Sequence, residues 1–92
     1  MITMRLAEIL DIRAASPLAG ELLNARGGHV TVDASNVQKL GAQCVQVLLS
    51  ARSTWAADGY SLVVADASEP FLAALATLGI QISDISEQDT EK

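Results

Sequence analysis

Residues 29–57 decide the fold, and they read HVTVDASNVQKLGAQCVQVLLSARSTWAA. The segment begins with a strict alternation, in which Val30 and Val32 face one way while Thr31 and Asp33 face the other. A period of two residues is typical of a strand with one buried face. A short polar connection follows this strand and leads into a segment with a different period.

The second period belongs to a helix predicted over residues 41–57, which at 1.5 Å per residue is about 25 Å long. Its inward stripe recurs every three or four residues and consists of Cys44, Leu48, Ala51 and Trp55. Its outward face is polar and consists of Gln43, Gln46, Ser50 and Thr54. Such an amphipathic helix packs its stripe against a sheet and leaves the other face in solvent.

Before this segment, residues 4–12 are apolar enough to predict a strand. A short helix is expected next, with Ser16 as its N-cap and Pro17 at its first helical position. The glycine pair at residues 27–28 supplies the left-handed stop that ends it.

After the long helix, residues 60–65 (YSLVVA) predict a strand that is buried on both faces. Ser68 is expected to cap a third helix, which Gly79 ends. Residues 80–82 offer a last short strand.

Alternating strands and helices of this kind predict an α/β fold. The expected sheet is parallel or mixed, with four strands or slightly more, and about three main helices pack on it. One domain is expected over residues 1–85, and the polar residues 86–92 are predicted to form a disordered tail.

Composition narrows the class of partner. Half of the 92 residues are hydrophobic, three are aromatic, and six Lys and Arg against eleven Asp and Glu give a net charge of -5. Nucleic acid requires clustered basic residues and stacking aromatics, so it is not expected as a partner.

No apolar run approaches the roughly 20 residues that cross a membrane, and a single cysteine fits a reducing compartment. A cytoplasmic protein without membrane insertion is therefore expected.

Four segments, read in order, give the chain a resemblance to the STAS family over about residues 10–80. They are LDIRAASPLAGELL, HVTVDASNV, the long helix from Gly41, and SEPFLAALATLGI. STAS domains occur in bacterial anti-sigma factor antagonists and in the cytoplasmic tails of sulfate transporters. More loosely, the chain resembles chemotaxis-associated bacterial STAS proteins with a degraded phosphoserine motif.

The resemblance implies a non-enzymatic module that binds a protein and needs no cofactor. In the family, the loop before the long helix reads Asp-Ser-Ser-Gly or Asp-Ser-Ala-Gly, and its hydroxyl is phosphorylated. Residues 41–44 of this chain read Gly-Ala-Gln-Cys and lack that hydroxyl. Ser35, Ser50 and Ser53 lie nearby, and nothing in the sequence singles one out.

The same resemblance places partner contacts around the start of the long helix. The predicted contact residues are Lys39, Gly41, Ala42, Gln43 and Gln46. The expected partner is a histidine-kinase-type protein, either an anti-sigma factor or a chemotaxis kinase. The alternative is the cytoplasmic STAS subunit of a lipid ABC transporter, and homodimerisation stays open.

The sequence gives only weak indications of a reactive thiol, a catalytic histidine or a metal site. Cys44 lies on the apolar stripe, which favours packing over reactivity. His29 has no Ser, Cys or second His at a catalytic spacing, which favours a place at a strand edge. Asp11, Asp33 and Asp66 follow predicted strands, where carboxylates more often bond turn amides than a metal.

Overall fold

The computed structural model describes residues 2–86. A three-stranded parallel sheet, in the order β1-β3-β5, forms its centre, and a second sheet of two parallel strands, β2 and β4, lies beyond it. The strands are β1 (Ile2–Arg5), β2 (Ile9–Leu10), β3 (Val30–Asp33), β4 (Lys39–Leu40) and β5 (Leu62–Ala65). The α-helices are α1 (Ala15–Asn24), α2 (Ala42–Asp58), α3 (Glu69–Thr77) and α4 (Ile82–Ile85), and a 3₁₀ turn, η1 (Ile12–Ala14), precedes α1.

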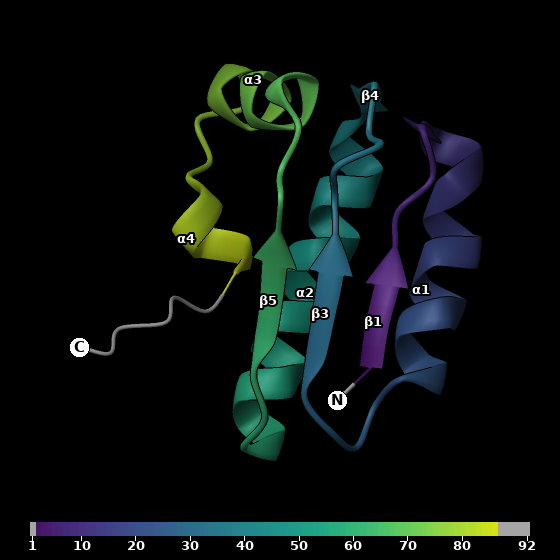
Figure 1. The fold of residues 1–92 in the computed structure, drawn as a ribbon, viewed down its shortest axis with the longest axis vertical. Coiled ribbons are helices and arrows are strands. Elements are labelled where there is room, and N and C mark those ends of the chain that lie inside the picture. The colour runs from purple at the N-terminus through teal and green to yellow at the C-terminus, as the bar shows by residue number, and fades with distance from the viewer. Residues whose placement is uncertain (1, 87–92) are drawn as a thin grey trace.

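Two layers make up the molecule, because α1 and α2 cover one face of the sheet and no described helix covers the other (Figure 1). Val30 and Val32 point into the covered face and are fully buried, whereas Thr31 and Asp33 are half-buried. The alternation predicted for this strand is therefore confirmed. The predicted burial of residues 60–65 on both faces is wrong, since only Leu62 of that strand is buried and its opposite face has no helix above it.

The long helix matches its prediction closely. All four residues of the predicted stripe (Cys44, Leu48, Ala51 and Trp55) are buried. Gly59 ends the helix with a left-handed φ of 82°, which a residue with a side chain adopts at a cost. The predicted cap of the third helix is also confirmed, because the Ser68 hydroxyl accepts the amide of Phe71 at 3.2 Å.

The N-terminal segment differs from its prediction, since one strand over residues 4–12 is replaced by β1, β2 and η1. The main ladder stops where the Leu6 amide bonds the Asp33 carbonyl, and the chain then turns to pair with β4 instead. The Asp11 carboxylate accepts the amide of Arg13 and so starts the 3₁₀ turn that runs into α1. Ser16 is therefore not the N-cap, and it lies with Pro17 inside the first turn, where a missing amide hydrogen is tolerated.

The C-terminal segment also differs. Residues 80–82 form no strand, so the main sheet has three strands rather than four. The Asp84 carboxylate accepts the Gln81 amide at 2.9 Å, which favours a helical turn over residues 82–85. Ser86, assigned by sequence to the tail, is buried, and its hydroxyl accepts the Val64 amide at 2.8 Å on the outer edge of β5. The rest of the predicted tail, residues 87–92, lies outside the described residues.

Candidate protein-docking surface

The small sheet of β2 and β4 sets the position of the first turn of α2. In its register Ile9 lies opposite Lys39 and Leu10 lies opposite Leu40. The Gly41 amide then donates to the Leu10 carbonyl at 2.8 Å. A Cβ on Gly41 would lie 3.3 Å from that carbonyl oxygen, so this position leaves little room for a side chain.

The five predicted contact residues gather where β4 passes into α2. Lys39, Ala42, Gln43 and Gln46 are exposed, and Gly41 is half-buried. Residues 39–43 lie together, whereas Gln46 lies one turn further along α2. No side chain caps the N-terminus of α2 in the described part of the chain, so its first amides stay available to a partner.

Two exposed isoleucines beside these residues were not identified from the sequence. Ile9 is 47% exposed and Ile12 is 66% exposed. Leu10 and Leu40 point into the core, so Ile9 and Lys39 must share the outward face of the two-stranded sheet. We define the docking surface as these two isoleucines together with Lys39, Gly41, Ala42, Gln43 and Gln46. An apolar centre with a polar rim is the usual composition of a protein interface.

The comparison with protein families identifies the domain. The family model described as "Mlab, STAS domain" matches residues 1–85. The chain belongs to the STAS domain family. No match was found among curated proteins or among solved structures. STAS domains are generally non-enzymatic modules that bind proteins.

The start of α2 is also where the resemblance places the phosphorylated hydroxyl of the classical antagonists. In this STAS domain residues 41–44 carry no hydroxyl group. Ser35, Ser50 and Ser53 are all exposed, so exposure does not distinguish these three alternatives.

The three aspartates considered as metal ligands have other partners or do not converge. Burial alone would raise the pKa of Asp11, but hydrogen bonds from the Arg13 amide and guanidinium outweigh it and lower the pKa. The hydroxyl and amide of Ser35 lower the pKa of Asp33. Among residues 2–86, no group of three His, Cys, Asp or Glu side chains is arranged to hold a metal ion.

The thiol of Cys44 is fully buried and donates to the Asp11 carbonyl at 3.4 Å. Burial raises the pKa of this thiol, and the nearby Asp11 charge raises it further. A protonated, enclosed thiol is a poor nucleophile. The packing role predicted for Cys44 is therefore the one its surroundings support.

His29 has a serine partner that its sequence spacing did not predict. Ser61, immediately before β5, places both its amide and its hydroxyl 3.0 Å from Nδ1 of His29. Because the Ser61 amide donates to Nδ1, that nitrogen is occupied as an acceptor and is not free to act as a base. The ring of Tyr60 packs edge-on against His29, with 5.3 Å between ring centroids. None of these partners is a carboxylate, so the pair lacks the orienting group of a catalytic triad.

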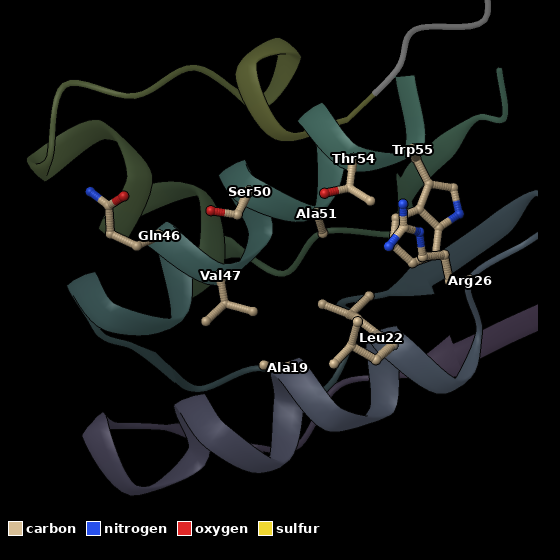
Figure 2. Close-up of a pocket in the computed structure, with 10 residues that line it drawn as sticks. Ala19, Leu22, Arg26, Gln46, Val47, Ser50, Ala51, Thr54 and Trp55 are labelled. Atoms are coloured by element: carbon tan, nitrogen blue, oxygen red, sulfur yellow. The ribbon is translucent and has the colours of Figure 1, made fainter. Parts of the chain in front are cut away.

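A groove of about 400 Å³ separates the outward faces of α1 and α2 (Figure 2). Its walls are mostly apolar and consist of Ala19, Leu22, Leu23, Val47, Ala51 and Trp55. Gln46 lies at one end and Arg26 at the other (Figure 2). Gln46 thus belongs both to the groove and to the docking surface.

No helix among residues 2–86 is long and apolar enough to span a membrane.

Proposed function

We propose that this STAS domain is a regulatory binding module that docks onto a kinase-type signalling protein through the docking surface. The observation that carries the proposal is the pair of exposed isoleucines beside the uncapped start of α2. An isolated exposed apolar residue is ordinary, but two large ones that flank a polar helix start favour a contact site.

The chemistry of the surface suits a specific contact. The side chains of Gln43 and Gln46 each donate and accept hydrogen bonds without a charge that must be desolvated. Lys39 adds one positive charge at the rim, in a chain whose net charge is -5. The partner is thus expected to offer an apolar patch with polar groups around it.

The family resemblance guides the choice of partner class. A histidine-kinase-type protein, either an anti-sigma factor or a chemotaxis kinase, is the partner we propose, and binding takes place in the cytoplasm. A nucleotide, where one is needed, is supplied by the partner. Since residues 41–44 carry no hydroxyl, the complex is not switched by phosphorylation at that position.

The test is affinity purification of the tagged chain from its own cells, with mass spectrometry of the proteins that accompany it. Recovery of a histidine-kinase-type protein supports the proposal, and the identity of that protein separates sigma-factor control from chemotaxis. Recovery of the ATPase and permease of a lipid ABC transporter contradicts it in favour of the alternative. Size-exclusion chromatography with light scattering decides whether the chain also forms a homodimer.

Two variants test the surface itself, namely Gln43→Glu and Gln46→Arg. Both positions are exposed helical sites, and a glutamate in the first turn of a helix is compatible with its dipole, so melting temperatures should not fall. Partner recovery should fall by tenfold or more in each variant. The matched controls are Ala76→Glu and Ala76→Arg on the exposed face of α3, which should leave recovery unchanged. Full recovery with both glutamine variants would contradict the proposed surface.

A further inference from the structure

The groove between α1 and α2 has the properties of a small-molecule site. Its volume of about 400 Å³ lies within the usual range of ligand sites, about 300–1,000 Å³. Leu22, Ala51 and Trp55 form its buried floor, and Leu23 at its rim is 65% exposed. An apolar floor with a few polar groups at its border is the common composition of such sites.

One wall of the groove carries polar side chains in a row. Gln46, Ser50 and Thr54 follow one another at four-residue spacing along α2 and border the groove. In α3 the Thr77 hydroxyl bonds the carbonyl four residues before it, which is the ordinary way a helical hydroxyl is satisfied. Among residues 2–86, Ser50 and Thr54 make no such bond, so their hydroxyls remain available to a bound molecule.

The cationic end of the groove is held in a fixed orientation. Arg26 extends from the end of α1 toward Trp55 (Figure 2). The Asp58 carboxylate, which does not line the groove, accepts hydrogen bonds from Nε at 2.8 Å and from Nη2 at 3.2 Å. These two bonds fix the plane of the guanidinium and leave the Nη1 hydrogens without an acceptor among the described residues. A guanidinium fixed in this way can hold a second carboxylate through its remaining donors.

The length of the groove limits the size of the ligand. Gln46 and Thr54 are eight residues apart, which corresponds to about 12 Å along the helix axis. An extended aliphatic chain advances about 1.2 Å per bond, as the extended backbone does, so roughly ten bonds span this distance.

From the apolar floor, the single cationic end and this length, we propose that the groove binds a free aliphatic monocarboxylate of about ten carbons. The alkyl chain lies along Leu22, Val47 and Ala51, and the carboxylate meets Nη1 of Arg26. Thr54 also lines the groove. This site is independent of the proposed signalling function, since it requires no protein partner.

The chain contains its own reporter for the test. Trp55 is the single tryptophan of the sequence, it is 3% exposed, and it lines the groove. Decanoate is titrated into the full chain below its self-association concentration, with 1-decanol as the neutral probe of equal chain length. The expected result is a saturable change in tryptophan fluorescence, with methyl NMR shifts at Leu22 and Val47, and tighter binding of decanoate than of 1-decanol.

Two variants separate the two parts of the site. Arg26→Gln should weaken decanoate binding by about tenfold, because a hydrogen bond to a charged group is lost, and should leave 1-decanol binding unchanged. Ala19→Leu fills the groove and should abolish binding of both probes, whereas Ala76→Leu on α3 should change neither. Ala76 is exposed and Ala19 is half-buried, and far-UV circular dichroism checks that each variant is folded.

Two results would overturn the proposal. The first is the absence of any saturable change with decanoate. If Ala19→Leu then also loses partner recovery, the groove is assigned to a helix of the partner instead. The second is an Arg26→Gln variant that binds decanoate as tightly as the unmodified chain does.

Discussion

Replacing Trp55 with phenylalanine tests how the α1–β3 connection is held against the long helix. The indole Nε1 donates to the Gly28 carbonyl at 2.8 Å, and the ring is 3% exposed. Phenylalanine keeps the aromatic character of the site but removes the donor and part of the volume. We expect Trp55→Phe to fold and to be less stable than the unmodified chain.

The size of the loss follows from two contributions. A buried carbonyl that loses its donor costs about 1–3 kcal/mol, and the half-buried Gly28 places this case near about 1 kcal/mol because water can replace the donor. The smaller ring leaves unfilled volume in the core. Complete truncation of a buried tryptophan to alanine costs about 3–5 kcal/mol, so the partial truncation to phenylalanine should cost about 1–2 kcal/mol. The expected loss in the free energy of unfolding is therefore about 2–3 kcal/mol.

The assay is urea unfolding followed by far-UV circular dichroism, because the substitution removes the fluorophore. Phe71→Leu is the comparison, since Phe71 is fully buried in α3 and its side chain has no polar group. Amide hydrogen exchange around Gly28 should accelerate in Trp55→Phe more than global destabilisation explains, and it should not do so in Phe71→Leu. A loss below about 1 kcal/mol, or equal exchange behaviour in the two variants at matched stability, would refute the role given to the hydrogen bond.

Three further outcomes are expected. Ile12→Asp should lower partner recovery by more than tenfold, since an isoleucine with 66% of its surface exposed is replaced by a charge that docking would desolvate, while Leu72→Asp on α3 should have no effect. Cys44 should react with iodoacetamide at pH 8 only after urea is added, because it is fully buried and its pKa is raised; rapid labelling of the folded chain would contradict this. The hydrogen bond and charge of Arg26 lower the pKa of Asp58, so this carboxylate stabilises the fold above its ordinary pKa of 3.8, and the stabilisation is lost as the pH falls below that value. Acid titration of Asp58→Asn should accordingly show a shallower loss of stability than the unmodified chain, and an identical slope would exclude this contribution.

The predictions from sequence that succeeded concern elements whose residues depend on their near neighbours. The buried stripe of α2 and the alternation of β3 follow from periods of 3.6 and 2 residues, and both are confirmed. The serine cap of α3 is equally local.

The predictions that failed depend on contacts that the period of the segment does not report. Residues 80–82 have the apolar residues of a strand, but the Asp84 carboxylate starts a helix there, and Ser86 rather than a fourth strand reaches the edge of β5. Residues 4–12 divide because their second half pairs with β4, roughly thirty residues later in the chain. Neither event leaves a periodic signal within the segment concerned.

The candidate docking surface also contains some residues that the sequence identified and others that it did not. The outward position of Gln43 and Gln46 follows from helical period, and both are exposed. Ile9 escaped detection because an apolar residue in a short strand is expected to be buried unless its pairing partner is known, and Ile12 because the predicted strand over residues 4–12 ends instead in the 3₁₀ turn η1. Once Leu10 and Leu40 are seen to fill the core, the opposite face of the ladder must be exposed.

The groove and the docking surface meet at Gln46, and this shared residue suggests how binding could be regulated in a chain that lacks the usual phosphorylated hydroxyl. With the carboxylate at Arg26, the alkyl end of the proposed ligand would lie near Gln46, which the proposed partner would also contact. Linkage then requires that the ligand change the affinity for the partner by the same factor by which the partner changes the affinity for the ligand. If both proposals hold, an aliphatic ligand would be a reversible control on the proposed contact surface, without a covalent change at residues 41–44.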